Sequence, residues 1–201
     1  MYQNETAIME SFRKTETLMR GRGKRMGRQV AILVESDFND LEYWYPYYRL
    51  VEEGYDPLVV APVAPRQYQG KSGTFADAAY TPRSIDFDLA AVVIPGGWAP
   101  DRIRMSQEMV ALVQRVYASG GIVASICHGG SVLVSAGILK GLKATSYASV
   151  RDDMILAGAE WVDEPVVVCG RLITSRKPAD LPLFAKALLH ALGPAETIGP
   201  K

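Results

Sequence analysis

Long apolar runs and an excess of charge of either sign are both missing from this sequence. The longest apolar runs, such as residues 89–95, are far shorter than the roughly 20 residues that a membrane-spanning helix needs. The 22 basic residues are balanced by 22 acidic ones, so no overall positive potential attracts nucleic acid or an anionic membrane surface. We therefore expect no membrane and no nucleic acid among the partners of this protein.

Cysteine and histidine are scarce as well. The chain contains two of each, and their positions match no structural zinc site. Two cysteines are also too few for the disulfide framework of a small secreted protein, so both are expected to be reduced thiols. Glycine patterns that bind phosphates or dinucleotides are missing too. The sequence therefore predicts neither a metal nor a cofactor.

The chain is predicted to form one domain with a short extension at each end. Its 201 residues suit a single core that buries roughly 70% of the surface of the unfolded chain. Residues 1–28 are polar and basic, so we expect a flexible appendage, with Met26 as an alternative start. Because this segment lacks the apolar stretch of a secretory signal, a cytoplasmic location is favoured. Residues 29–193 carry the core pattern, and residues 194–201 are expected to form a tail.

Short apolar runs alternate with longer helical patterns between residues 29 and 193. Four runs are typical of buried parallel strands, namely residues 30–34, 58–61, 91–94 and 122–126. Three segments are typical of amphipathic helices, namely residues 39–53, 107–119 and 180–192. Two further segments contain turn glycines and each predict a small hairpin, at residues 68–83 and 166–175. The alternation indicates an α/β fold in which helices cover a mainly parallel sheet.

The segment Ser125-Ile126-Cys127-His128-Gly129 carries the strongest chemical signal. An apolar strand leads into Cys127 and a new helix follows at once, so the thiol is expected at a sharp turn, the cysteine counterpart of a nucleophile elbow. The helix dipole and the backbone amides left accessible by Gly129 and Gly130 should lower the pKa of this thiol. The plainer alternative, a small buried hydrophobic residue, does not account for the two glycines or the adjacent histidine.

Two side chains are candidates to act on this thiol. His128 is the candidate base, because His190 lies in an amphipathic terminal helix; the acid that would fix the tautomer of His128 is not placed by the sequence. Pro46 should kink the helix that contains Glu42 and turn this carboxyl inward, whereas a helix cap explains Asp37. A buried Glu42 should have a raised pKa and could donate a proton to the thiolate, and such a pair would favour oxidation to a sulfinate.

A second glycine turn, residues 95–102, follows the strand at residues 91–94. It should lie at the same sheet edge as Cys127, where its backbone N–H groups would form half of an oxyanion hole. Taken alone, such a turn is weak evidence of a site, since most only reverse the chain. Trp98 within it is expected either to narrow the pocket and stack on a substrate or to pack at a subunit contact.

Together these segments resemble the ThiJ/PfpI family, in particular its PfpI branch of intracellular cysteine peptidases and general stress proteins. The resemblance spans about residues 29–192 and implies a flavodoxin-like three-layer sandwich that assembles as a homodimer or a larger ring. It rests on Asp40-Leu41-Glu42, Tyr45-Pro46-Tyr47, Pro95-Gly96-Gly97, Ala99-Pro100-Asp101, the cysteine segment at 125–129, Thr145-Ser146-Tyr147, Asp152-Asp153 and residues 158–163.

The resemblance also implies a role for each site residue. Cys127 would be the nucleophile, Glu42 the carboxyl partner of its sulfur and His128 the adjacent base. Asp101 would complete the triad from a neighbouring subunit. The oxyanion amides and the pocket would come from Gly96, Gly97, Trp98, His128, Gly129 and Tyr147. The chain departs from the family pattern at Asp101, where a longer Glu is usual, at Gly130, where Pro is usual, and at Ala148.

Two functions from different classes follow from these residues. In the first, Cys127 attacks the carbonyl carbon of a peptide, a glyoxal or an early glycation adduct, so the protein is a peptidase or a glyoxalase-like or deglycase-like hydrolase. In the second, the protein is a sensor or protectant in oxidative stress that is oxidised at Cys127 and stabilised by Glu42. The pair of His128 and Asp101 favours catalysis, since a sensor needs no imidazole base. A glutamine amidotransferase would need a late His-Pro-Glu type triad, which His190-Ala191-Leu192 does not supply.

Overall fold

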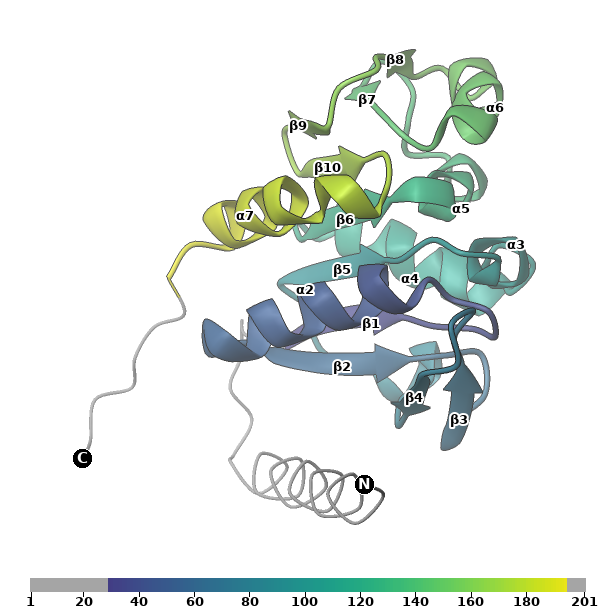
Figure 1. Ribbon diagram of the computed structural model, residues 1–201, viewed down its shortest axis with the longest axis vertical. Coiled ribbons are helices and arrows are strands. Elements are labelled where there is room, and N and C mark those ends of the chain that lie inside the picture. The colour runs from purple at the N-terminus through teal and green to yellow at the C-terminus, as the bar shows by residue number, and fades with distance from the viewer. Residues whose placement is uncertain (1–28, 195–201) are drawn as a thin grey trace.

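A six-stranded sheet lies at the centre of the structure, a computed structural model that describes residues 29–194 (Figure 1). The strand order is β2-β1-β5-β6-β10-β9, and every neighbouring pair is parallel except β9 with β10. The bounds are β1 Gln29–Leu33, β2 Asp56–Val60, β5 Ala91–Ile94, β6 Ile122–Ile126, β9 Val166–Cys169 and β10 Leu172–Ser175. The four predicted strands and the mainly parallel sheet are confirmed.

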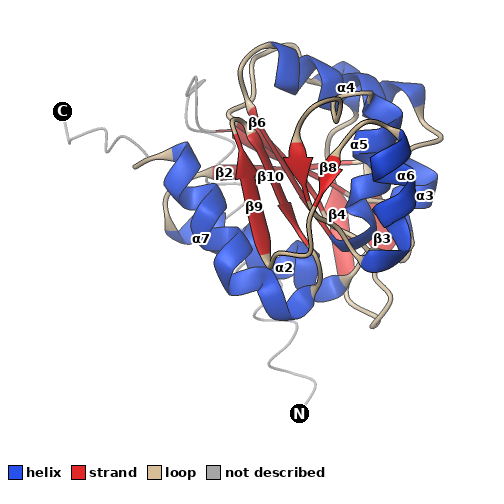
Figure 2. Ribbon diagram, turned by 90° about the horizontal axis from the view of Figure 1, so that it is seen from above, coloured by secondary structure: helices blue, strands red, loops and turns tan. Residues whose placement is uncertain are grey.

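Helices cover both faces of this sheet (Figure 2). Helices α2 (Asp40–Glu52) and α7 (Leu181–Leu192) pack together on one face. The other face carries α3 (Ala99–Ile103), α4 (Gln107–Ala118), α5 (Gly130–Ala136) and α6 (Arg151–Leu156). The predicted three-layer sandwich and its three long helices are confirmed. None of the helices between residues 29 and 194 has the length and apolarity to cross a membrane.

Both predicted hairpins are present. Strands β3 (Arg66–Gln69) and β4 (Phe75–Ala78) form a separate antiparallel sheet, whereas the β9–β10 hairpin continues the main sheet beside β6. A short parallel pair, β7 (Lys143–Ala144) and β8 (Glu160–Trp161), was not predicted, because two-residue strands show no alternation. Single-turn 3₁₀ helices occupy η1 Pro82–Ser84, η2 Cys127–Gly129, η3 Ala148–Val150 and η4 Pro178–Asp180.

The buried central strands position the site. Strands β5 and β6 are buried at every residue, as expected for parallel strands that are covered on both faces. Because β1, β5 and β6 are adjacent and parallel, the loops at residues 34–39, 95–98 and 127–129 emerge side by side at one edge. Two expected segments lie outside the described residues, namely the appendage at residues 1–28 and residues 195–201 of the tail. The domain boundaries therefore stay a prediction.

Candidate active site

Cys127 lies at the sharp turn between β6 and η2. Its φ of +60° is in the left-handed region, and Asp37 is the other non-glycine residue with positive φ in the described chain. Such a conformation is strained for a residue with a side chain. The side chain is 7% exposed, and the thiol is free, as is that of Cys169. The turn therefore holds one buried sulfur beneath the loops that follow β1 and β5.

Glu42 is completely buried on α2 next to this sulfur. Its Oε2 accepts the backbone N–H of Gly96 at 2.8 Å, while its buried Oε1 has no well-formed hydrogen bond within residues 29–194. The carboxyl also interacts with the thiol of Cys127. Burial raises the pKa of Glu42 to about 7, although the Gly96 N–H, Cys127 and the charge of Lys71 each lower it. Glu42 is therefore partly protonated at neutral pH.

Two glycines let the loop after β5 approach the carboxyl and the sulfur closely. A Cβ atom on Gly96 would lie 2.6 Å from Glu42 Oε2 and 2.7 Å from the Cβ of Cys127. Gly97 has a φ of +82°, and its Cβ would lie 2.4 Å from the carbonyl oxygen of Asp37. Any side chain at Gly96 would push the carboxyl away from the thiol, and one at Gly97 would displace the loop after β1.

Two backbone N–H groups, those of His128 and Gly97, lie near the sulfur of Cys127 and lower the pKa of its thiol. They are the amides that the motif comparison assigned to the oxyanion hole. The N–H of Gly129 is not among these groups, and a Cβ on Gly129 would lie 2.5 Å from the carbonyl oxygen of Ile94. Gly129 therefore permits close packing of the turn on β5.

The pKa of the Cys127 thiol is raised to about 12, so the expected lowering is wrong. Burial is the largest cause and the negative charge of Glu42 adds to it, while the amides of His128 and Gly97 act in the opposite direction. The helical segments after Cys127 are short, with three residues in η2 and seven in α5. The partial charge at their start does not offset the loss of solvent. The thiol therefore needs a base to remove its proton.

His128 lies next to this thiol. Its Nδ1 lies 3.2 Å from Cys127 Sγ, and its Nε2 lies 3.2 Å from Ser149 Oγ. The ring stacks on Tyr147 with centroids 4.9 Å apart, which restricts its rotation. Burial lowers the pKa of His128. The ring is therefore neutral at pH 7 and able to accept a proton.

Asp101 and Lys71 act on His128 through their charges. Asp101 lies in α3 with an exposed side chain, and its negative charge raises the pKa of His128. Lys71 has the opposite effect on this pKa. No hydrogen bond joins Asp101 to the ring within residues 29–194 of one chain. The role of Asp101 in a neighbouring subunit stays a prediction.

Lys71 and Trp98 form an exposed rim beside the site. The Nζ of Lys71 lies 4.4 Å from the centre of the Trp98 ring, and this ring is 57% exposed. The loop that contains Lys71 is held by the buried carboxylate of Asp40, which accepts the backbone N–H groups of Ser72 at 2.7 Å and Thr74 at 3.0 Å. In one chain Trp98 therefore faces solvent and is available to a substrate or a partner.

Asp37 is not the cap of α2. The cap is Asn39, whose Oδ1 accepts the N–H of Glu42 at 3.2 Å. The carboxylate of Asp37 instead pairs with Arg102 at 2.8 Å. The expected cap was two residues too early, because an acidic residue before a helix is compatible with either position.

Sequence reasoning did not identify Ser149 and Lys71. Ser149 is in η3 and Lys71 is in the β3–β4 hairpin, so neither follows a strand of the main sheet. The motif Thr145-Ser146-Tyr147 and the departure from the family pattern at Ala148 were the signals close to Ser149.

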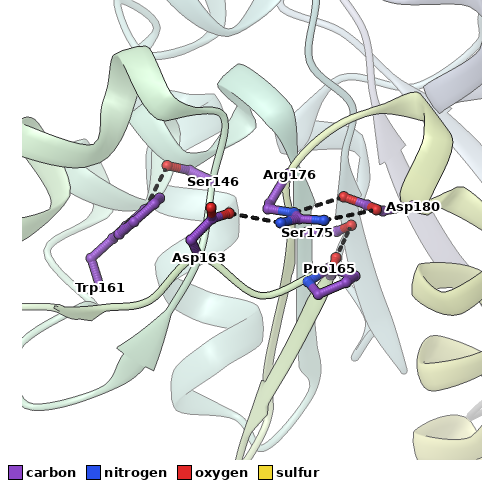
Figure 3. Close-up of polar contacts among 7 residues, drawn as sticks. All are labelled: Ser146, Trp161, Asp163, Pro165, Ser175, Arg176 and Asp180. Carbon is purple, nitrogen blue, oxygen red and sulfur yellow. Dashed lines mark hydrogen bonds and ion pairs between the residues drawn. The ribbon is translucent and has the colours of Figure 1, made fainter.

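The segment at residues 145–150, which carries Tyr147 and Ser149, is fastened to the rest of the fold (Figure 3). Trp161 Nε1–H donates to the hydroxyl of Ser146 at 3.1 Å, and the N–H of Thr145 donates to Thr174 Oγ1 at 2.9 Å. The loop after β8 is connected to β10 and η4 by a network in which Arg176 pairs with Asp163 at 2.7 Å and Asp180 at 3.0 Å, and the hydroxyl of Ser175 donates to the carbonyl oxygen of Pro165 at 2.7 Å.

Comparisons with known proteins agree with this fold. Residues 28–191 match the model of the DJ-1/PfpI family. A protein of Pyrococcus horikoshii named as a deglycase is 44% identical over 167 residues, which cover 82% of this chain and 99% of that protein. General stress protein 18 of Bacillus subtilis is 38% identical over 172 residues, covering 83% and 99%.

A solved structure with two domains is similar as well. It comes from Anabaena variabilis and contains a DJ-1/ThiJ/PfpI-like domain and a ferritin-like domain. The TM-score is 0.80 at 38% identity, and the match covers 85% of this chain but 51% of that chain, about half its length. The predicted flavodoxin-like fold is confirmed.

Proposed function

Because the chain belongs to the DJ-1/PfpI family, we propose that it is a cysteine-dependent hydrolase that acts on a carbonyl carbon, with Cys127 as the nucleophile. One observation supports this proposal above the others: Nδ1 of a neutral His128 lies 3.2 Å from the buried thiol. The strained turn at Cys127 is the geometry expected of a nucleophile elbow.

The first chemical step is attack of sulfur on the substrate carbonyl while the thiol proton moves to Nδ1 of His128. The raised pKa of Cys127 keeps the thiol protonated until the substrate arrives. The N–H groups of Gly97 and His128 act on the sulfur, so we assign them to the oxyanion that forms on the attacked carbon. With a peptide or a glycation adduct, His128 returns its proton to the leaving amine, and water then hydrolyses the intermediate bound to sulfur. A glyoxal has no leaving group, so its thiohemiacetal must first shift a proton from one carbon to the other and become a thioester, which water hydrolyses to the hydroxy acid.

Small carbonyl compounds and glycation adducts are the substrates that we favour over peptides. The relative that is 44% identical is named as a deglycase. In addition, Tyr147 stacks on His128 and Trp98 follows Gly97, and both rings are partly exposed, at 43% and 57%, so they are available to contact a small planar group.

Turnover of methylglyoxal and of a fluorogenic peptide tests this proposal. Cys127→Ala should abolish turnover of whichever substrate the wild type accepts. Cys169→Ala is the matched control, because Cys169 lies on β9 away from His128, and it should keep the wild-type rate. Retention of activity in Cys127→Ala would remove Cys127 as the nucleophile. The substrate that the wild type prefers would decide between a peptidase and a hydrolase of small carbonyl compounds.

A second function, oxidative-stress sensing at Cys127, is supported by Glu42. With a pKa of about 7, Glu42 is able to hold a proton on Oε1, the buried oxygen without a partner, and to donate it to an oxidised sulfur. The name of general stress protein 18 agrees with this function. Intact mass measured after peroxide treatment tests it. A wild type that turns over neither substrate but gains two oxygen atoms at Cys127 would replace the hydrolase with the sensor.

We also propose that the protein assembles as a homodimer or a larger ring. Helix α2 exposes three large apolar side chains, Leu41, Tyr45 and Tyr48, with exposed fractions of 62%, 38% and 44%. Burial of such a patch in a subunit contact is favourable. Light scattering after size exclusion should give a mass of at least two chains, and a monomer at all concentrations would contradict the proposal. The cytoplasmic location stays a prediction.

A further inference from the structure

The peptide unit between Gly96 and Gly97 carries one of the N–H groups that we assign to the oxyanion. This N–H, on Gly97, lies near the sulfur of Cys127. The carbonyl oxygen of the same peptide unit, on Gly96, accepts the N–H of Asn39 at 3.1 Å. The peptide is trans, so its C=O and N–H point in opposite directions, and the contact with Asn39 keeps the Gly97 N–H on the side of the sulfur. The orientation of this N–H therefore depends on the loop at residues 36–39.

The loop at residues 36–39 packs closely against this peptide unit. The carbonyl oxygen of Asp37 accepts the N–H of Trp98 at 2.9 Å, and Phe38 forms an antiparallel bridge with Gly97. A Cβ on Gly97 would lie 2.4 Å from the carbonyl oxygen of Asp37. Because the two loops are in direct backbone contact, a change of backbone conformation at Asp37 would displace Gly97.

Asp37 has a backbone conformation that few residues with a side chain adopt. Its φ is +64°, in the left-handed region, which glycine adopts freely, asparagine and aspartate tolerate, and alanine adopts only under strain. Two hydrogen bonds belong to this conformation, one from its N–H to the carbonyl oxygen of Gln69 at 2.8 Å and one from Trp98 to its own oxygen. Contacts of the Asp37 side chain can add to these and stabilise the turn.

Arg102 provides such contacts from helix α3. Its guanidinium group pairs with the carboxylate of Asp37 at 2.8 Å and donates to the carbonyl oxygen of Ser36 at 2.7 Å. Helix α3 follows directly after the loop that contains Gly97. The segment from Trp98 to Arg102 is therefore bound to the loop after β1 at both of its ends.

We infer that Asp37 and Arg102 are positioning residues: their ion pair holds Asp37 in the left-handed conformation and so keeps the Gly97 N–H directed at the reacting group on Cys127. The side chains of Arg102 and Asp37 are 46% and 37% exposed, so the pair contributes little to overall stability and its loss should act on the loop. The inference rests on the proposed function for its effect on turnover, whereas the conformation of the loop is a property of the free protein.

Substitutions of Asp37 separate its backbone conformation from its charge. Asp37→Ala, Asp37→Asn and Asp37→Gly all remove the carboxylate, but only alanine resists a positive φ. In Asp37→Ala we expect kcat/KM for methylglyoxal to fall about fivefold to thirtyfold, which corresponds to the cost of the left-handed conformation. Asp37→Asn and Asp37→Gly should recover most of this loss.

Amide hydrogen exchange measured by NMR tests the loop without any substrate. The N–H groups of Asn39 and Trp98, which make the two contacts between the loops, should exchange faster in Asp37→Ala than in Asp37→Asn or Asp37→Gly. The N–H of Thr145, which is bonded to Thr174 Oγ1 outside these loops, should exchange at the wild-type rate in every variant and so reports that the fold is intact.

Arg102→Met tests the other side of the ion pair. It should lower kcat/KM and speed the exchange of the same two amides in the wild-type background, with a smaller effect in the Asp37→Gly background, where the pair is already absent. Arg83→Met is the matched control, because it breaks another exposed ion pair, with Glu108, and it should behave as the wild type.

Three results would overturn the inference. These are wild-type exchange and turnover in Asp37→Ala, glycine and asparagine variants as impaired as the alanine variant, and an effect of Arg102→Met that is the same in both backgrounds. If no substrate is turned over but the exchange rates follow the expected order, the positioning role stands and the hydrolase proposal fails.

Discussion

Replacing Glu42 with glutamine should remove much of the pH dependence of folding stability. In the wild type, burial raises the pKa of Glu42 from 4.5 to about 7, so the folded chain holds this proton more tightly than the unfolded chain. The resulting stability is fully present below the unfolded pKa and is lost as the pH rises through the folded pKa. The rise corresponds to roughly 3 kcal/mol, most of which is lost between about pH 5 and pH 8.5.

Glutamine keeps the shape of the side chain and removes its titration. Its oxygen can still accept the N–H of Gly96, as Glu42 Oε2 does at 2.8 Å. Its amide nitrogen then takes the place of the buried oxygen without a partner. Between about pH 5 and pH 8.5, where the wild type comes to bury a charge, the stability of the variant relative to the wild type should rise by about 2–3 kcal/mol.

Urea unfolding followed by circular dichroism, at several pH values and one protein concentration, measures this difference. Glu52→Gln is the matched control, because Glu52 is an exposed acid on the same helix that pairs with Arg49, and its pH dependence should follow the wild type. All other titrating groups are shared, so they cancel in the comparison. An equal loss of stability in wild type and Glu42→Gln over this range would refute the assignment of a buried, partly protonated carboxyl.

Three shorter predictions test other contacts of the site. Gly96→Ala should lower the free energy of unfolding by about 1–3 kcal/mol, because its Cβ would lie 2.6 Å from Glu42 Oε2; unchanged urea unfolding would contradict this. Lys71→Met should raise the pKa of Glu42 and of His128, since its charge lowers both, and NMR titration of His128 reads the change directly. Arg176→Met leaves Asp180 without its ion pair and should lower the free energy of unfolding, with Arg176→Lys recovering part of the loss; equal stability of all three proteins would rule this out.

The residues of the site that could be predicted are those whose positions follow from the ends of the sheet strands. Cys127 and Gly97 each follow a short apolar strand, and neighbouring parallel strands bring their ends together, so local patterns suffice to place them at one edge. Ser149 and Lys71 reach the same edge from a 3₁₀ turn and an outlying hairpin. Their approach depends on long-range contacts, such as Trp161 with Ser146, that no local period encodes.

The pKa of the Cys127 thiol also depends on contacts that a local sequence pattern does not encode. The helix that follows Cys127 is a local feature, and its dipole acts in the direction that stabilises an anion. Burial is a non-local feature, and it dominates: the pKa is raised to about 12. The pattern therefore placed Cys127 correctly at the turn but gave the wrong sign for the shift of its thiol pKa.

The raised pKa of the Cys127 thiol bears on the choice between a hydrolase and an oxidative-stress sensor. Oxidation by peroxide needs a standing thiolate, which burial and the charge of Glu42 oppose. General-base attack needs only a protonated thiol beside a neutral imidazole, and this is the state of Cys127 and His128 in the structure. A substrate that brings a carbonyl to the sulfur can use this resting pair at once, whereas an oxidant must first overcome the burial of the thiolate. The electrostatics of the site thus favour hydrolysis over sensing in the absence of a change that lowers the thiol pKa.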